Sequence, residues 1–234
     1  MHILITGSSG FIGNFLKTHL SEKHEIIEFD INPDSKNVIN ACKEKEVINF
    51  FSLLPKKYAN IDMLINCLGV PDSANKLLFK DLIDVDLESF TKLIDINLTS
   101  IFVIIREFVR NYPHCQSNII NISSLYSVVS PRLDIYSGNI KHPGYIASKF
   151  GLVGLTRYLA VLVAKHNMKI NCIAPAAVKE TLGVDGEFLQ KYNQQVPLKR
   201  PVEMNDILDV VNMLTSNKNI TGQNLIIDGG YTLW

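Results

Sequence analysis

Tyr145 and Lys149 are the two residues of this sequence whose types and spacing most directly suggest chemistry. They stand four residues apart in Gly144-Tyr-Ile-Ala-Ser-Lys149, a spacing that places both side chains on one face of a helix. A free tyrosine has a pKa of about 10, and a neighbouring ammonium group favours the phenolate and lowers that pKa. The pair therefore predicts a tyrosine that transfers protons. In isolation, the same pair is more often two surface residues.

Other polar residues support the chemical interpretation. Ser123 and Ser124 follow directly after the predicted strand Asn118–Ile122, so they stand at its carboxyl end. Asn97 lies in an otherwise apolar helical face, where an unpaired amide would be costly. A buried structural asparagine bonded to backbone is the alternative explanation of Asn97.

A glycine-rich turn, Thr6-Gly-Ser-Ser-Gly-Phe-Ile-Gly13, joins a first predicted strand to a first predicted helix. Glycine permits a tight turn and a close approach of the backbone to a pyrophosphate, and the following helix N-terminus offers N–H groups to phosphates. An ordinary strand–helix turn is the alternative, which the position of the motif disfavours. The predicted cofactor contacts of this loop are Gly7, Ser9, Gly10, Phe11, Ile12 and Gly13.

Asp30 ends the second predicted strand, twenty residues after Gly10. A carboxylate there accepts hydrogen bonds from ribose hydroxyls and repels a 2′-phosphate. No Arg or Lys occupies the glycine loop or positions 29–32, so the sequence predicts NAD (NADH) rather than NADP. A solvated turn aspartate before Pro33 is the alternative. Asn40 follows a short predicted third strand. Its side-chain amide either contacts the adenine edge of the cofactor or stabilises a turn of the chain.

Apolar, β-branched segments alternate with helical patterns along the chain, which predicts an α/β fold. We expect a Rossmann-like, doubly wound parallel sheet of about seven strands in three layers (α/β/α), forming one domain over residues 1–234. Ligands in such folds bind beyond the carboxyl ends of the strands. The predicted strands are His2–Thr6, Glu25–Phe29, Asn37–Asn40, Met63–Cys67, Asn118–Ile122, Lys169–Ile173 and Asn224–Ile227. The predicted helices are Phe11–Ser21, Glu44–Leu53, Glu88–Arg110 (with Asp86 as N-cap), Tyr145–Lys165 and Glu203–Thr215, and the segments expected to be irregular are Pro131–Pro143 and Pro175–Pro201.

Composition narrows the class of protein. The 234 residues are 47% hydrophobic and carry 23 basic and 23 acidic side chains. Zero formal charge argues against nucleic-acid or electrostatic membrane binding. The four cysteines are widely spaced without a CxxC pair, so we expect neither a metal site nor disulfides, and a cytoplasmic location. No apolar run approaches the roughly 18 residues of a membrane span, and no signal peptide is evident.

Together these residues resemble the short-chain dehydrogenase/reductase family over essentially the whole chain, with the motifs in the expected order. The resemblance implies that Tyr145 is the general acid/base and that Lys149 binds the nicotinamide ribose and lowers the Tyr145 pKa. It implies that Ser124 holds the substrate oxygen and that Asn97 anchors a water in the proton relay. Ser124 is preferred because the family's serine is usually the second of such a pair, with Ser123 as the alternative. Further implied cofactor contacts are Asn66, Cys67, Gly69, Pro175 and Val178.

The sequence departs from the family pattern in four places. The TGxxGxxG spacing is that of the larger sugar-nucleotide branch, although the C-terminal Thr221–Gly230 pattern is that of the single-domain branch. The family's Asn-Asn-Ala-Gly is Asn66-Cys-Leu-Gly69 here. Its Pro-Gly turn is Pro175-Ala-Ala-Val178, and Thr181 comes one residue later than usual. Ser124 and Tyr145 stand 21 residues apart, farther than is common in the family.

The extra residues are Arg132–His142. They lie in the chain between two predicted catalytic residues, Ser124 and Tyr145, so we expect this insertion to border the substrate pocket. A solvated surface loop is the alternative, and His142 is expected to be an ordinary loop histidine. The insertion's polar residues are Arg132, Tyr136, Asn139, Lys141 and His142. Segments 124–131, 134–136 and 188–192 resemble bacterial oxidoreductases of flagellin and surface-glycan modification, which build nonulosonic sugars.

These features predict an NAD-dependent oxidoreductase that interconverts a secondary alcohol and a ketone, with an amino-sugar or sugar-phosphate substrate. A ketoacyl thioester or other small ketone is the alternative substrate. A non-enzymatic NAD-sensing protein is the alternative of another class, although it would not need Asn97, Ser124, Tyr145 and Lys149. The family resemblance implies a homodimer or homotetramer formed through the two long helices.

Overall fold

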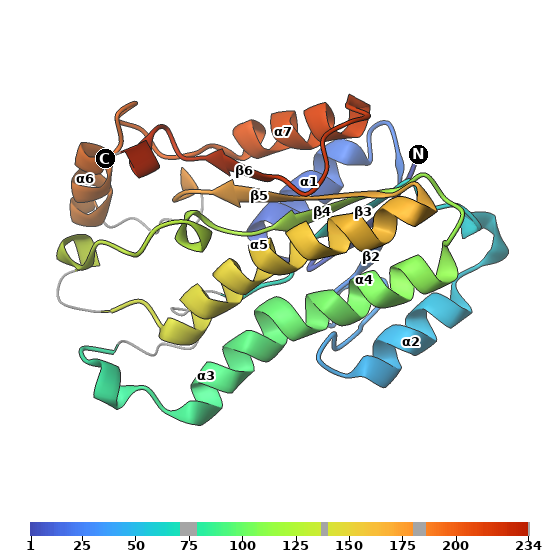
Figure 1. Ribbon diagram of the computed structural model, residues 1–234, viewed down its shortest axis with the longest axis horizontal. Coiled ribbons are helices and arrows are strands. Elements are labelled where there is room, and N and C mark those ends of the chain that lie inside the picture. The colour runs from blue at the N-terminus through green and yellow to red at the C-terminus, as the bar shows by residue number, and fades with distance from the viewer. Residues whose placement is uncertain (71–78, 137–139, 180–185, 234) are drawn as a thin grey trace.

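The computed structural model describes residues 1–70, 79–136, 140–179 and 186–233. Six strands in this part of the chain form one parallel sheet in the order β2-β1-β3-β4-β5-β6 (Figure 1). Their bounds are β1 His2–Thr6, β2 Glu25–Phe29, β3 Met63–Asn66, β4 Asn118–Ile122, β5 Lys169–Pro175 and β6 Asn224–Ile227.

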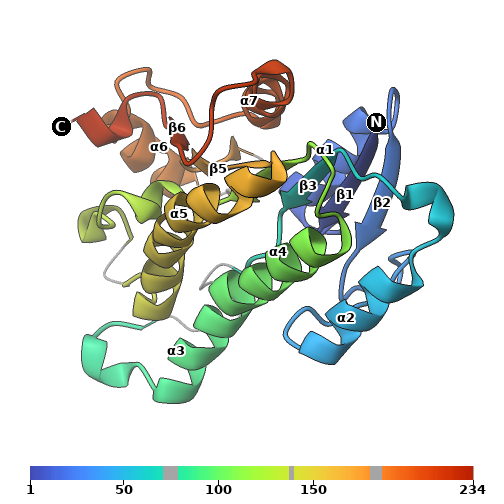
Figure 2. The same ribbon diagram turned by 45° about the vertical axis from the view of Figure 1, so that its right-hand side comes forward.

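The central strands are buried on both faces, which explains their continuous apolar sequences. Alternate side chains of β1 enter different cores: Leu4 packs into one, and Ile3 and Ile5 pack into the other. Helices α2 (Glu44–Leu53), α4 (Ser100–Asn111) and α5 (Pro143–Val163) cover the Leu4 face. Helices α1 (Phe11–Leu20) and α7 (Met204–Ser216) cover the opposite face, giving the predicted three layers (Figure 2).

The predicted strand at 37–40 is reduced to a single parallel bridge between Asp30 and Val38. Its amide and carbonyl groups still tie the segment to the sheet, since Asp30 N–H donates to Asn37 O and Ile39 N–H donates to Asp30 O. Within the part of the chain that the structure describes, the sheet therefore has six strands rather than about seven.

The predicted helix 88–110 has three parts: α3 (Leu87–Ile94), a π-helical turn (Asp95–Thr99) and α4. Asp86 is the N-cap of α3, as predicted, and accepts a hydrogen bond from Ser89 N–H. The segment 175–201 is not wholly irregular, because it contains α6 (Gly186–Gln195). Short 3₁₀ segments occur at Lys56–Tyr58, Leu82–Asp84, Leu125–Ser127, Leu133–Tyr136 (η6), Ala164–His166 and Tyr231–Leu233.

One helix in the described ranges, Pro143–His166, is long and apolar enough to span a membrane by length and composition. The sequence-based expectation that no apolar stretch has that length was therefore wrong. This helix is α5 with its 3₁₀ extension, and Leu152, Leu159 and Val163 place one face of it in the sheet core. We attribute its hydropathy to packing.

Strand order reverses direction between β1 and β3, since β2 lies on one side of β1 and the later strands lie on the other. Crevices at such switch points bind ligands in open α/β sheets. The glycine loop after β1 and the Asn66–Gly69 segment after β3 both lie at this point.

Candidate active site

The glycine loop is shaped for close backbone approach. Gly7 has φ +69°, and a Cβ there would lie 2.7 Å from the Leu68 backbone nitrogen. A Cβ on Gly13 would lie 2.1 Å from the Gly7 carbonyl oxygen, so α1 can pack this tightly only on a glycine. Gly10 is the N-cap of α1 and supplies no side-chain cap, which leaves the first-turn amides of Phe11 and Ile12 directed at the switch point.

Asp30 is fixed against this loop. Its Oδ2 accepts from Ser9 N–H at 2.9 Å, and its Oδ1 accepts from Asn32 N–H at 2.9 Å. Each carboxylate oxygen has two acceptor positions, so both oxygens keep one for a ligand hydroxyl. The carboxylate is therefore oriented in advance rather than being a solvated turn residue.

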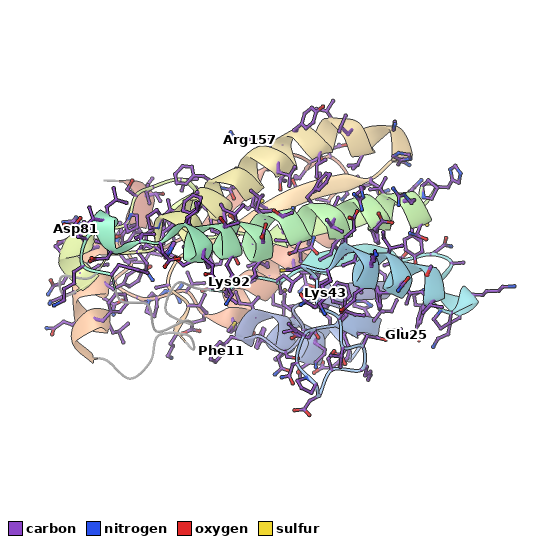
Figure 3. All side chains as sticks on the ribbon, turned by 90° about the horizontal axis from the view of Figure 1, so that it is seen from below. Phe11, Glu25, Lys43, Asp81, Lys92 and Arg157 are labelled. Carbon is purple, nitrogen blue, oxygen red and sulfur yellow. The ribbon has the colours of Figure 1, made fainter. Side chains whose placement is uncertain are left out.

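A cavity of about 1120 Å³ opens at the switch point. It is bordered by the glycine loop, the segment after β2, the segment after β3 and one side of α3. In Figure 3, Phe11 at the start of α1 and Lys92 on α3 mark two of the elements around it. The predicted contacts that line it are Gly7, Ser9, Gly10, Asp30, Asn40, Cys67 and Gly69.

Two predicted cofactor contacts are used within the protein. The Asn66 side chain is fully buried: its Oδ1 accepts from Thr6 Oγ1 at 3.0 Å, and its Nδ2 donates to Asn121 Oδ1 at 2.8 Å. Asn40 Oδ1 accepts from Cys42 N–H. These contacts make Asn66 a support of the sheet edge, and only Asn40 of the two borders the cavity.

Cys67, in place of the family's second asparagine, faces the same cavity. Desolvation raises the pKa of its thiol to about 12, so the sulfur stays protonated and neutral. Gly69 follows, and a Cβ there would lie 3.3 Å from Lys149 Nζ and 3.5 Å from Asn97 Oδ1. The absence of a side chain at Gly69 thus keeps the approach to these two groups open.

Lys149 is buried, with 5% of its surface exposed. Its Nζ donates to Ile122 O at 3.2 Å and lies 5.8 Å from the centre of the Tyr145 ring. Desolvation lowers the Lys149 pKa to about 8. The predicted pair is therefore adjacent on α5, with the ammonium held by the last carbonyl of β4.

Asn97 is brought to α5 by the π-helical turn. Its Oδ1 accepts from Val70 N–H at 2.9 Å, and its Nδ2 lies 3.2 Å from Val70 O and 3.3 Å from Ser148 Oγ. Ser148 Oγ in turn donates to the Tyr145 carbonyl at 2.7 Å. Asn97 is thus both a bonded buried asparagine and a neighbour of the Tyr145 turn, and π-turns of this kind are frequent at functional sites.

The two serines differ in their bonds. Ser123 Oγ donates to Lys149 O at 3.4 Å. Ser124 Oγ accepts from Tyr126 N–H at 3.2 Å, which leaves its hydroxyl hydrogen to be donated elsewhere. This difference favours Ser124 for a substrate oxygen.

The turn after β5 is held by its own contacts. Pro175 ends β5, Ala177 N–H donates to Tyr192 OH at 3.2 Å, and Val178 forms a parallel bridge with Val202. Thr181 lies outside the described residues. The sequence indicated Tyr192 only through the resemblance of segment 188–192, and not its structural contacts: it is buried in α6 and stacks between Phe188 and Tyr231.

The insertion is partly ordered against α6. Arg132 Nη1 donates to Gln195 Oε1 at 2.6 Å, and Arg132 also pairs with Asp134 at 3.2 Å. Ile140 N–H donates to Phe79 O. The insertion is therefore not only a solvated loop, although Asn139 lies outside the described residues.

His142 differs most from its prediction, because it is fully buried and caps α5 rather than lying in a loop. Lys141, beside it, is half-buried.

Comparison with known proteins agrees with this geometry. Residues 21–232 match the family model described as Enoyl-(Acyl carrier protein) reductase. The chain is 30% identical over 242 residues to the 3-oxoacyl-[acyl-carrier-protein] reductase FabG of Rickettsia felis, covering 97% of this chain and 95% of that protein. The chain belongs to the short-chain dehydrogenase/reductase family.

Solved structures of family members support the same conclusion. A short-chain dehydrogenase from Leptospira borgpetersenii with bound NAD⁺ superimposes with a TM-score of 0.87 at 29% identity, covering 99% of this chain and 92% of that one. A 4-hydroxyisoleucine dehydrogenase complexed with NADH gives 0.84 at 25% identity, covering 100% and 99%. This short-chain dehydrogenase/reductase is thus an NAD(P)-dependent oxidoreductase acting on CH–OH groups.

Proposed function

We propose that this short-chain dehydrogenase/reductase interconverts a secondary alcohol and a ketone with Tyr145 as its general acid/base. The observation that carries the proposal is the arrangement on α5: the buried Lys149 ammonium lies beside the Tyr145 ring, and Asn97 is bonded to Ser148 in the same helical turn. The proposal depends on this proximity, because a cation close to a tyrosine favours its phenolate form.

The chain's own residues would orient the reactants and move the proton. Bound nicotinamide would supply the hydride donor or acceptor. The first-turn amides of α1 suit the pyrophosphate, Asp30 suits a ribose diol, and Ser124 suits the substrate oxygen. Tyr145 would protonate that oxygen during reduction, and Lys149 would stabilise the resulting phenolate. Asn97, through its bonds to Val70 and Ser148, would keep this turn of α5 in place beside a relay water.

We infer a preference for NAD(H) over NADP(H). Asp30 holds a pre-oriented carboxylate where a 2′-phosphate would be repelled. The Leptospira and 4-hydroxyisoleucine enzymes were solved with NAD⁺ and NADH. Fluorescence titration should give tighter binding of NADH than of NADPH, and Asp30→Ala should narrow the difference by at least tenfold. Tighter NADPH binding by the wild type would overturn the preference.

For the substrate, we propose an amino-sugar or sugar-phosphate derivative in bacterial glycan biosynthesis. The resemblance of the insertion and of 188–192 to flagellin-glycosylation oxidoreductases supports it, as do the polar groups that join the insertion to α6. A ketoacyl thioester is the second candidate, favoured by the 30% identity with FabG. Arg132 contacts Asp134 and Gln195, so binding of a substrate phosphate by Arg132 would require exchange of these partners.

The decisive experiment is turnover by wild type and Tyr145→Phe with NADH and two probe sets: ketosugar phosphates and acetoacetyl thioester. The variant should bind NADH within twofold of wild type and lose at least a hundredfold in kcat. Equal turnover in both proteins would overturn the assigned chemistry. NADH binding without turnover on any probe would favour the NAD-sensing alternative.

We further propose that the chain forms one domain and assembles as a homodimer or homotetramer. In a single chain α5 is not buried all round: Tyr158, Val161 and Leu162 are exposed, with 73% of Val161 accessible. Arg157 marks this outer side of α5 in Figure 3. Phe102 of α4 borders a groove beside Leu162. Light scattering should give a multiple of 26.3 kDa, and Val161→Glu should reduce it.

A further inference from the structure

His142 satisfies the start of helix α5 almost alone. Its Nδ1 accepts from Gly144 N–H at 3.0 Å, and its carbonyl accepts from Tyr145 N–H and Ile146 N–H at 3.0 and 3.3 Å. Pro143, the first helical residue, has no N–H to satisfy. The backbone amide of Tyr145 is therefore fixed directly by His142.

The imidazole ring is fixed from its other side by helix α3. His142 Nε2 lies 3.0 Å from Ser89 Oγ, and Ser89 Oγ lies 3.0 Å from Asp86 Oδ2. Because Gly144 donates to Nδ1, a neutral ring carries its proton on Nε2 and donates to Ser89, which donates to Asp86. The hydrogen bonds therefore run in one direction, each group donating to the next, from Gly144 of α5 through His142 and Ser89 to Asp86, the N-cap of α3.

Packing leaves the ring little room. His142 has no exposed surface, and Phe79 meets it edge-on with the ring centres 5.1 Å apart. A Cβ on Gly144 would lie 2.9 Å from Phe90 O, so α5 starts directly on the backbone of α3. One turn later, Ser148 and Asn97 join α5 to the π-helical turn that follows α3. Tyr145 lies between these two attachments.

We propose that His142, as a neutral imidazole, is a positioning residue that fixes Tyr145 for proton transfer. The proposal rests on the assignment of Tyr145 as acid/base. Protonation of Nδ1 would place an N–H against Gly144 N–H, which breaks the cap and adds a positive charge at a helix N-terminus, where cations are unfavourable. The start of α5 would then loosen in acid.

The charged groups nearest the ring come from α3 and from residues flanking it in sequence. The Asp86 carboxylate, reached through Ser89 on α3, would favour a protonated ring. Lys80, which follows Phe79, is exposed, and Lys141, which precedes His142, is half-buried. The hydrogen bond from Gly144 N–H can form only while Nδ1 is unprotonated, and this is the state that we propose holds Tyr145 in position.

Three variants separate this role from simple packing. Asparagine is a strong N-cap that does not titrate, so His142→Asn should restore the bond to Gly144, whereas His142→Ala should not. His114→Ala, at an exposed histidine, is the matched control. Loss of a cap is worth about 1 kcal/mol, which corresponds to roughly fivefold faster hydrogen exchange.

The cap itself is tested without substrate. ¹⁵N-histidine NMR at pH 7.5 should show Nδ1 unprotonated and Nε2 protonated. The protection factor of peptide 143–149, in which each exchange rate is corrected for the intrinsic rate at that pH, should fall about fivefold in His142→Ala and in wild type at acid pH, but not in His142→Asn or His114→Ala. A protonated Nδ1, or exchange equal in all four proteins, overturns the proposal. If His142→Ala does not fold, the wild-type pH series compared with His142→Asn decides.

Positioning is tested by turnover on whichever probe, ketosugar phosphate or acetoacetyl thioester, the wild type reduces. His142→Ala should lose at least tenfold in kcat with an unchanged KM for NADH. His142→Asn should recover to within threefold and lack the acid limb of wild type. Equal losses in both variants, or an identical acid limb in wild type and His142→Asn, overturn the proposal. Undiminished turnover by Tyr145→Phe would instead refute the proposed function. In that case the NMR and hydrogen-exchange results would still test whether His142 caps α5.

Discussion

Lys149 is expected to cost this protein stability, and Lys149→Met should therefore be more stable than wild type at neutral pH. Burial lowers the Lys149 pKa from 10.5 to about 8. Each tenfold change in proton affinity is worth about 1.36 kcal/mol, so burying the charged form costs roughly 3 kcal/mol. Methionine has a similar length without the charge. The variant also loses the hydrogen bond to Ile122 O, which offsets about 1 kcal/mol of this benefit. The free energy of unfolding should therefore rise by about 2 kcal/mol at pH 7.

The pH dependence distinguishes this mechanism from better packing. Between the folded pKa of about 8 and the unfolded value of 10.5, the unfolded chain binds more protons, so wild-type stability rises with pH. The gain from Lys149→Met is therefore complete below pH 8 and shrinks above it, to roughly 0.5 kcal/mol at pH 9.5.

Urea unfolding at pH 7 and pH 9.5, at equal protein concentration and without cofactor, measures this difference. Lys218→Met, at an exposed lysine, is the control and should change the free energy of unfolding by less than about 0.5 kcal/mol at both pH values. A variant no more stable than wild type at pH 7, or a gain that persists at pH 9.5, would refute the reasoning. Turnover should be lost in the same variant, because function and stability oppose each other here.

Two further substitutions, Gly13→Ala and Asn121→Ala, test the supports of the site, and Gly154→Ala is a control. Gly13→Ala should lower the free energy of unfolding by about 3 kcal/mol and abolish NADH binding, since its Cβ would meet Gly7 O at 2.1 Å; Gly154→Ala, with nothing within 4 Å, should instead raise the melting temperature. Asn121→Ala should cost about 3 kcal/mol in urea unfolding, because it removes the acceptor of the buried Asn66 Nδ2 and the amide that donates to Thr156 Oγ1. A Gly13→Ala protein that binds NADH normally, or an Asn121→Ala protein as stable as wild type, would contradict these assignments.

Much of the fold was predictable because its signals are local. Six of the predicted strands agree with β1 to β6 to within a residue or two, since buried parallel strands are continuous apolar runs. The glycine loop was recognisable from its place between a strand and a helix. The predicted strand at 37–40 forms only a single bridge to Asp30. Its short polar sequence does not distinguish one bridge from a full strand.

Features that depend on contacts distant in sequence were missed. Helix α6 is mostly polar, and its stacked aromatic residues Phe188 and Tyr192 find their partner Tyr231 only in the folded chain. The π-helical turn that directs Asn97 leaves the apolar pattern of its helix nearly continuous. His142 was expected in a loop because histidine is not a preferred N-cap, and its partner Ser89 lies 53 residues away.

A series of buried, hydrogen-bonded polar side chains explains how the glycine loop and α5, the helix that carries Tyr145, are held in a fixed position relative to each other. Thr6 Oγ1 donates to Asn66, Asn66 donates to Asn121, and Asn121 donates to Thr156 of α5. The first three residues occupy the same register position on β1, β3 and β4. Apolar side chains would fill this space without fixing one register, whereas each amide here accepts only one arrangement of donors and acceptors. The chain therefore gives up some packing at the carboxyl edge of the sheet, and in return the glycine loop after Thr6 is held at a fixed offset from α5. Such an offset would be required for hydride transfer to the substrate carbon and proton transfer to its oxygen at one site.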